Sequence, residues 1–242
     1  MDKWYEVPGK AGTNVIYSRV RLVRNLKEYP FPGCLTKEQS AELSEKLLGG
    51  LTGIASMDRM QYRFTHLERM GDLEKTALLE RRAINRSVMK KKDPTGMILS
   101  EDESTAILLN GDDHVRIQTL QLTLEQLYER ADKIDDYISE RFDYAFDEKY
   151  GYLTSFPTNV GTGLRAAVVL HLPMLSKNKN FNSLVADMGR FGTQVRGVYG
   201  EGAENFGSLY QISNQKTLGQ TEREIIDIVR KAALELDVQE RR

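Results

Sequence analysis

Residues 96–120, GMILSEDESTAILLNGDDHVRIQTL, carry the pattern that decides the fold. Two runs rich in aliphatic residues, Gly96–Leu99 and Ser104–Asn110, flank the polar tip Ser100–Glu103, which predicts a β-hairpin. A third run, His114–Leu120, follows after a short polar turn and should extend the hairpin as another antiparallel strand. We therefore expect an antiparallel sheet.

Helices and further strands are predicted on both sides of this stretch. The strongest helical signal lies in Leu122–Arg141, where apolar residues recur every three or four positions. Two other predicted helices begin with capping boxes, at Thr36/Gln39 and at Thr221/Glu224. Strands grouped together, with helices elsewhere, favour an α+β fold. The other predicted strands are Asn14–Arg21, Arg165–Leu172, Gln194–Tyr199 and Ser208–Ser213, and the predicted helices are Leu122–Arg141, Thr221–Leu236, Thr36–Gly50, Leu73–Ile84 and Ser183–Arg190.

Composition excludes several classes of protein. The 242 residues include 34 Lys+Arg and 35 Asp+Glu, and this near-neutral balance argues against an obligate binder of nucleic acid or membrane surfaces. The single cysteine, Cys34, excludes an internal disulfide, and we expect it to be a small buried or partly buried residue. No signal peptide or membrane span is visible, so we expect a cytoplasmic protein.

The familiar nucleotide and metal motifs are missing. The sequence has no GxxxxGK[ST] and no well-placed GxGxxG, so neither a P-loop nor a Rossmann phosphate site is supported. Its three histidines are scattered and form no HExxH or Cys/His cluster, so we expect no metal held by protein side chains.

Arginines on predicted strands are the most informative polar pattern. Arg19 and Arg21 are two residues apart and should share one face of a strand. Asp112, His114 and Arg116 have the same spacing, which would place them on one face as well. Each segment is also compatible with a solvated strand face that carries ion pairs, and His114 could equally satisfy polar groups inside the sheet.

Two more arginines fit the same pattern. Arg165 directly precedes the apolar run AAVVLHL, so its guanidinium should have an anionic partner. Arg196 opens RGVYGEG, which is either a simple turn or part of a binding loop. Together these guanidinium groups predict a cradle for a polyphosphate, with Asp112 and Glu201 as the carboxylates that position a second substrate.

Five segments resemble the phosphagen (guanidino) kinases. They are VIYSRVRLVRN (15–25), NGDDHVRIQ (110–118), GYLTSFPTNVGTGLRA (151–166), RGVYGEGAE (196–204) and YQISNQKTLGQTE (210–222). The start of the chain and the segments LSEDES and RGVYGEG are similar to the branch of bacterial protein-arginine kinases (McsB-type).

The resemblance implies a fold and a reaction. The fold would be a large antiparallel sheet flanked by helices, the glutamine-synthetase-like catalytic domain of this family, over residues 1–242, without the small N-terminal helical domain or a C-terminal phosphoarginine-binding domain. The reaction would transfer the γ-phosphoryl group of MgATP to arginine side chains of proteins, with Mg²⁺ held mainly through the nucleotide phosphates. Implied partners are proteins that present arginine, a zinc-binding activator and a Clp protease, in a bacterial stress response.

The resemblance also assigns roles by position. Arg19, Arg21, Arg116, Arg165 and Arg196 would bind the phosphates. Asp112 and Glu201 fall on the two guanidinium-binding carboxylates, and Asp112 is the usual candidate for the base. The remaining nucleotide-site residues would be Ser18, Arg82 beside the adenine, Ala166, Ala167, Val168, Val169, Gly197, Val198, Tyr199 and Gly200.

Three departures from the family pattern leave alternatives open. Where the family has NEEDH this chain has NGDDH, so Gly111 removes an acid and Asp112 withdraws the carboxylate by about 1.5 Å. Phe156 replaces the reactive cysteine, and Arg82 replaces a histidine. The alternatives are a pseudokinase that binds nucleotide with little turnover, or a kinase of a free guanidino metabolite.

Overall fold

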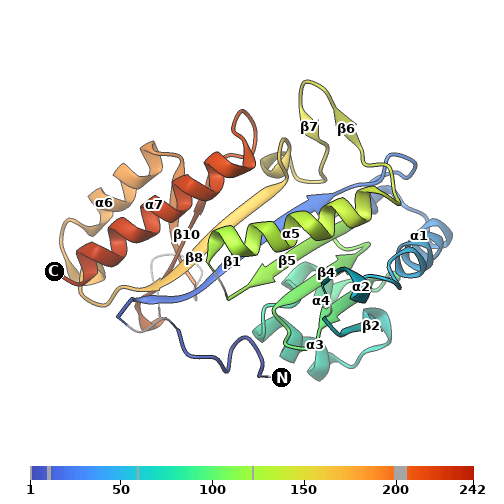
Figure 1. Cartoon of the computed structure of the whole chain (residues 1–242), viewed down its shortest axis with the longest axis horizontal. Helices are drawn as coiled ribbons and strands as arrows, with labels where there is room; N and C mark the ends of the chain where they lie inside the picture. The colour runs from blue at the N-terminus through green and yellow to red at the C-terminus, as the bar shows by residue number, and fades with distance from the viewer. Residues whose placement is uncertain (1, 10–11, 59, 122, 199–205) are drawn as a thin grey trace.

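The computed structural model describes residues 2–9, 12–58, 60–121, 123–198 and 206–242 (Figure 1). Their centre is an eight-stranded sheet in the order β2-β3-β4-β5-β1-β8-β10-β9, and every neighbouring pair is antiparallel. The expected α+β class with a large antiparallel sheet is confirmed. The strands are β1 (Val15–Arg24), β2 (Tyr62–His66), β3 (Gly96–Ser100), β4 (Thr105–Leu109), β5 (Val115–Leu120), β8 (Leu164–His171), β9 (Thr193–Gly197) and β10 (Leu209–Asn214), and β6 (Phe146–Asp147) pairs separately with β7 (Gly151–Tyr152).

Seven α-helices occur in the described part of the chain. Thr36, Thr123 and Thr221 each accept the amide of the third helical residue and so form complete capping boxes, of which the one at Thr123 was not predicted. The helix predicted over Leu73–Ile84 ends at Glu80, and a separate short helix follows. The helices are α1 (Lys37–Gly50), α2 (Ala55–Asp58), α3 (Asp72–Glu80), α4 (Arg86–Lys90), α5 (Leu124–Ser139), α6 (Phe181–Arg190) and α7 (Glu222–Glu240).

The predicted hairpin is present and continues as predicted. Gly96 pairs with Leu109 and Leu99 with Ala106, and β5 then adds to β4 with Leu109 opposite Val115. All residues of β3, β4 and β5 are buried; helices cover both faces of β3 and β4. β2 at the sheet edge was missed, because its sequence YRFTH contains only two apolar residues, Tyr62 and Phe64.

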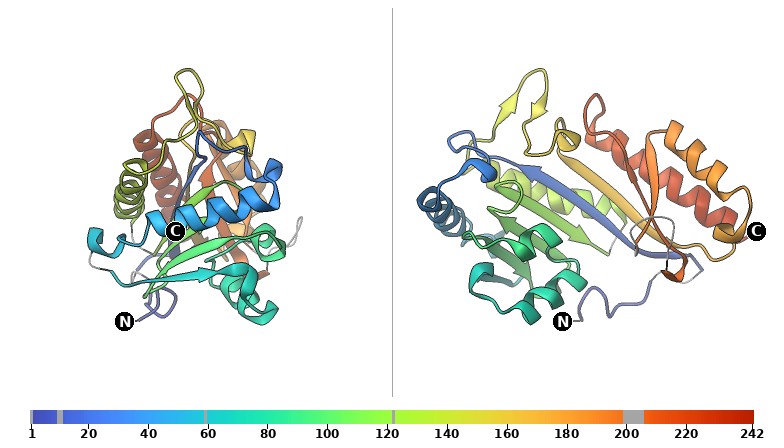
Figure 2. Two further views of the ribbon diagram at one scale, coloured as in Figure 1. Left: turned by 90° about the vertical axis from the view of Figure 1, so that its right-hand side faces the viewer. Right: turned by 180° about the vertical axis from the view of Figure 1, so that it is seen from behind.

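The two faces of the sheet are covered differently. α1, α5 and α7 pack on one face and form the main core with residues such as Val20 and Leu22 of β1. On the other face, a smaller core under α3 and α4 covers only the β3–β4 end. The view from behind in Figure 2 looks onto β1 and β8 with no helix in front of them. Side chains of the central strands on this face, including Arg19 and Arg21 of β1, line a cavity described below.

Candidate active site

The open face of the sheet carries the arginines. Arg21 of β1 lies directly opposite Arg165 of β8, and Arg116 of β5 lies opposite Val23, two positions along β1. Arg196 of β9 pairs with Gln211 of β10. Since alternate strand residues share a face, these guanidinium groups and that of Arg19 line one cavity of about 370 Å³. The predicted cluster is thus assembled from four strands.

The cluster is strongly electropositive. Burial, followed by repulsion from Arg116, Arg19 and Arg165, lowers the pKa of Arg21 to about 9. Burial and repulsion from Arg19 lower the pKa of Arg116 to about 10. The Nε atoms of Arg21 and Arg116 are buried without a hydrogen-bond partner among the described residues. Like charges held this close are unfavourable, so the site is built for an anion with several oxygens.

Arg165 and Arg19 are held in place by neutral groups. Arg165 donates from Nη1 to the carbonyl of Asn214 (2.7 Å), from Nη2 to that of Thr158 (3.0 Å) and from Nε to Oδ1 of Asn159 (3.3 Å). Arg19 donates to Oε1 of Gln211 at 2.9 Å. No carboxylate pairs with Arg165 in the described part of the chain, so the anionic partner expected for it stays a prediction. The fixed guanidinium groups therefore retain their charge for a ligand.

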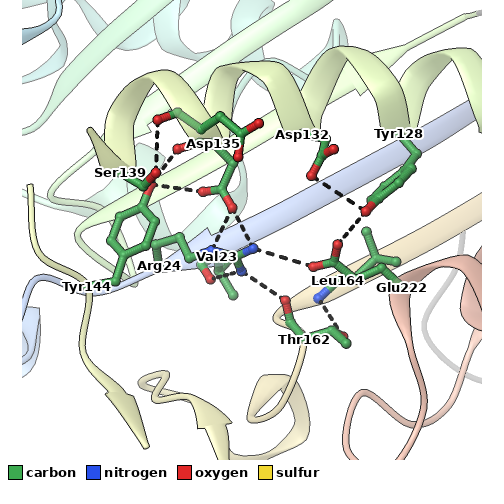
Figure 3. A network of polar contacts seen from close by, with 11 residues as sticks. Val23, Arg24, Tyr128, Asp132, Asp135, Ser139, Tyr144, Thr162, Leu164 and Glu222 are labelled. Carbon is green, nitrogen blue, oxygen red and sulfur yellow. Dashed lines mark hydrogen bonds and ion pairs between the residues drawn. The ribbon is translucent and has the colours of Figure 1, made fainter. Parts of the chain in front are cut away.

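A buried network on the opposite side of the sheet fixes the loop that leads to Arg165 (Figure 3). Arg24, 1% exposed, donates to Oδ2 of Asp135 on α5 from Nη2 at 2.7 Å and from Nε at 3.0 Å. Its Nη1 donates to the carbonyl of Thr162 at 2.8 Å, and Nη2 lies 3.5 Å from Glu222 of α7. The ring of Tyr152 lies 3.6 Å from the guanidinium carbon. Two helices and the loop before β8 are thus tied to one side chain.

A second, larger cavity adjoins the arginine cluster. Its volume is about 980 Å³, and it shares Arg19, Arg21 and Arg116 with the first. Arg82 lines it in a left-handed conformation just beyond α3 (φ 67°), and Gln118 donates to the Arg82 carbonyl. Its other lining side chains include Leu79, Ile84 and Val198. Apolar and arginine side chains beside a phosphate-binding cluster suit the base and sugar of a nucleotide.

Asp112 lies on the turn before β5 and borders the arginine cavity. Its carboxylate accepts hydrogen bonds from Nδ2 of Asn85 (2.7 Å) and from the hydroxyl of Ser87. Phe156, 51% exposed, lines the same cavity. Asp113 is buried and accepts from Nδ2 of Asn25 at 2.7 Å. Both carboxylates thus border the arginine cavity, and Asp112 is the one held by Asn85 and Ser87.

His114 does not share a face with Asp112 and Arg116, so that prediction is wrong. β5 begins only at Val115, and the buried imidazole turns away from the cavity. Its Nδ1 accepts the amide N–H of Leu26 at 2.9 Å, and its Nε2–H donates to the carbonyl of Pro30 at 2.9 Å. Burial lowers the pKa of His114 to about 4. His114 therefore has the structural role that the sequence left open.

Strand alternation corrects two further placements. The side chains of Ser18 and Val168 line an apolar groove of about 570 Å³ on the helix-covered face, opposite the arginines. Ala166 and Ala167 border the arginine cavity, and Val169 is buried between β1 and β10. The side chain of Ser18 therefore does not face the predicted nucleotide site.

The rest of the predicted nucleotide loop is only partly described. Gly197 ends β9, and Val198 lines the larger cavity. Glu201, Tyr199 and Gly200 lie outside the described residues. Elsewhere, Cys34 is exposed, so the prediction of a buried or partly buried thiol is wrong.

Sequence reasoning missed Asn85 and Ser87. Asn85 caps α4 through the amide of Val88 at 2.9 Å, and an asparagine three residues before the first buried position of a short helix is a recognisable signal. No sequence pattern announced that the same side chain also contacts Asp112. In the described residues, no three His, Cys, Asp or Glu side chains are grouped to hold a metal ion. None of the described helices is long and apolar enough to cross a membrane.

Comparison with known proteins agrees with this geometry. Residues 45–242 match the family model "ATP:guanido phosphotransferase, C-terminal catalytic domain". The protein-arginine kinase of Caldanaerobacter subterraneus subsp. tengcongensis is 40% identical over 230 residues, which cover 94% of this chain and 68% of the relative. That of Bacillus velezensis is 39% identical over 243 residues, 100% of this chain and 67% of the relative.

Solved structures agree in fold. Lombricine kinase superposes with a TM-score of 0.83 at 24% identity, over 97% of this chain and 68% of that chain. The duplicated taurocyamine kinase from Schistosoma mansoni with bound transition state analog components gives a TM-score of 0.82 at 26% identity, over 93% of this chain and 32% of that chain.

Proposed function

This chain belongs to the ATP:guanido phosphotransferase family, and we propose that it is a protein-arginine kinase that uses MgATP. The observation that carries the proposal is a cluster of five guanidinium groups on one open sheet face, which outnumber the two carboxylates, Asp112 and Asp113, that line the same cavity in the described part of the chain. The five are Arg19, Arg21, Arg116, Arg165 and Arg196. Such a cluster binds a triphosphate without a glycine-rich loop.

The residues present fit the nucleotide. The buried, unpartnered Nε atoms of Arg21 and Arg116 need oxygen acceptors, which phosphates supply. The larger cavity, with Arg82 and Val198, would take the base and ribose. Mg²⁺ would enter on the phosphates, where it offsets their charge. By resemblance, Gly197, Val198, Tyr199 and Gly200 would also belong to the nucleotide site.

The protein would contribute to the reaction mainly by aligning the two substrates. A guanidino nitrogen of the acceptor attacks the γ-phosphorus, a nitrogen–phosphorus bond forms, and the bond to the bridging oxygen breaks to release ADP. We assign to Asp112 the roles of orienting the acceptor guanidinium and accepting the proton that the nitrogen loses. Glu201 would hold the other side of the guanidinium. The arginines stabilise charge on the transferred group and on the leaving ADP.

The direct test is incubation with MgATP and an arginine-rich protein such as casein, followed by mass spectrometry under non-acidic handling. Phosphoarginine on the protein, lost in Asp112→Ala and in Glu201→Ala, is the expected result. A matched control is Asp147→Ala, which changes an acid on the separate β6–β7 hairpin. Nucleotide binding without transfer would indicate a nucleotide-binding regulatory module, and transfer only to free arginine would indicate a kinase of a small guanidino compound.

The proposal includes a cellular setting. Residues 1–242 would act as one catalytic unit built on the single large sheet, in the cytoplasm. A zinc-binding activator and a Clp protease are proposed partners on the strength of the sequence resemblance alone. Co-purification of either protein with the tagged chain tests this part independently of catalysis.

A further inference from the structure

The turn that carries Asp112 is attached to α4 by side chains to which the mechanism above assigns no role. Asn85 donates from Nδ2 to Oδ2 of Asp112 at 2.7 Å, and the Ser87 hydroxyl donates to Oδ1. Lys91, just after α4, donates from Nζ to the carbonyls of Asn110 (2.7 Å) and Gly111 (3.0 Å). Both the backbone of the turn and the Asp112 carboxylate are therefore held from the same short helix.

The orientation of the Asn85 amide is fixed by a second contact. Its Oδ1 accepts the amide N–H of Val88 at 2.9 Å, as the N-cap of α4. Because the oxygen is used in this way, the NH₂ group must face Asp112. The cap of the helix and the position of the carboxylate thus depend on one side chain.

Close packing at Gly111 makes this attachment possible. A Cβ atom at Gly111 would lie 3.2 Å from Cγ2 of Val88, which is closer than ordinary contact. A larger residue would push the turn away from α4. Glycine at this position and the short side chain of Asp112 are therefore consistent with one arrangement, in which the carboxylate is drawn against Asn85 and Ser87.

The two hydrogen bonds leave the carboxylate available to a ligand. Each carboxylate oxygen accepts one hydrogen bond from the α4 segment and retains a further lone pair. Asp112 borders the arginine cavity, and its charge raises the pKa values of Arg21 and Arg116 against the larger effects of burial and of repulsion between arginines. An incoming guanidinium can therefore bind to the unused lone pairs without breaking the attachment.

We propose that Asn85 and Ser87 are positioning residues that hold Asp112 at the angle the acceptor guanidinium requires, and so adapt the site to an aspartate. This inference rests on the proposed kinase function. The α4 segment would then position the Asp112 carboxylate in addition to covering one end of the sheet.

Substitutions can separate positioning from folding. Ser87→Ala removes one donor, and Asn85→Ser removes the other while keeping a good N-cap for α4. We expect kcat for protein arginine to fall about 10-fold in each single variant and about 100-fold in the double variant, the order of effect of a 1 Å misplacement. Ser87→Thr, which keeps the hydroxyl, should retain most of the activity.

Two readouts distinguish this role from a structural one. The KM for ATP and the melting temperature should change little in Ser87→Ala, because Ser87 lines neither the arginine cavity nor the larger cavity, whereas Asn85 lines both. The matched control is Ser56→Ala, an exposed serine in the short helix α2 whose hydroxyl binds only the Gly53 carbonyl among the described residues.

The possible results are decisive in both directions. An active wild type with Asn85→Ser and Ser87→Ala at equal kcat would overturn the positioning role and leave the kinase function standing. Loss of kcat together with loss of nucleotide affinity and a lower melting temperature would show a structural role instead. A wild type that transfers no phosphoryl group to any guanidinium would overturn the proposed function, and the inference with it.

Discussion

Replacing Arg116 by methionine should make the nucleotide-free protein more stable and its nucleotide site weaker. Arg116 is 7% exposed, its Nε has no partner among the described residues, and the hydrogen bond from its Nη2 to the carbonyl of Ala83 is long at 3.5 Å. Methionine has a similar length and no charge. The substitution therefore removes a poorly compensated buried cation with little change in packing.

The size of the effect follows from the pKa of Arg116. Burial and Arg19 lower it to about 10, well below the ordinary value for arginine, which corresponds to a cost of about 3 kcal/mol for keeping the group charged. At pH 7 the cost is complete, because the pH lies below the pKa of Arg116 in both the folded and the unfolded protein. The cost would disappear only as the pH rises above about 10 toward the ordinary pKa of arginine. Allowing for the lost contact, we expect a gain of about 2 kcal/mol in Arg116→Met.

Nucleotide binding should respond in the opposite direction. Loss of a charged donor to phosphate costs about 1.5–3 kcal/mol, or roughly 10- to 150-fold in affinity for MgADP. Urea unfolding with and without MgADP measures both effects, since ligand at 100 times its Kd stabilises the folded state by about 2.7 kcal/mol. Arg63→Met, at an exposed position on β2, is the control and should change neither quantity.

The reasoning would be refuted by one pattern of results. If Arg116→Met were less stable than the wild type without nucleotide, and MgADP stabilised both proteins equally, Arg116 would be an ordinary structural arginine. The unfavourable burial and mutual repulsion of the arginines would then be absent.

Other substitutions test other parts of the account. Arg24→Met leaves the buried Asp135 carboxylate without its main partner, so the free energy of unfolding in urea should fall by about 3–5 kcal/mol. Adding Asp135→Leu should recover most of this loss. An unchanged stability would contradict the network of Figure 3. The pKa of His114 is about 4 in the folded protein and 6.5 in the unfolded chain. The stability that the neutral imidazole contributes is therefore complete above about pH 6.5 and falls by up to about 3 kcal/mol toward pH 4. His114→Asn should flatten this part of the stability–pH curve, and a curve parallel to that of the wild type would contradict the buried, neutral state of His114. Ser18→Ala should leave the MgADP affinity within about 2-fold, because its side chain faces away from the arginines, and calorimetry showing a larger loss would contradict that placement. Asp112→Glu should not raise kcat, because the longer side chain no longer fits between Asn85 and Ser87, whereas a faster enzyme would show that the short acid limits the rate.

The fold was predictable where local signals agreed with the final packing. The hairpin and third strand over residues 96–120 were predictable because apolar runs alternate with polar turns, and Arg19 and Arg21 could be placed on one face from their spacing alone. The edge strand β2 and the short helix α4 were not predictable in this way, since each contains only two apolar residues.

The site was predictable in composition but not in all of its contacts. The two-residue spacing of Asp112, His114 and Arg116 wrongly predicted that all three share one strand face. The strand begins only after His114, so the alternation of faces does not extend back to Asp112. Resemblance assigned Ser18 by its position in a motif and ignored that its neighbour Arg19 must point the other way. The contact of Asn85 with Asp112 joins residues 27 positions apart, which no local pattern contains.

A crystal structure with MgADP would test the central claim most directly. The account predicts phosphate oxygens within hydrogen-bond distance of Arg21, Arg116 and Arg165, on the open face of the sheet. Phosphates bound elsewhere, with these three guanidinium groups directed away from them, would contradict it.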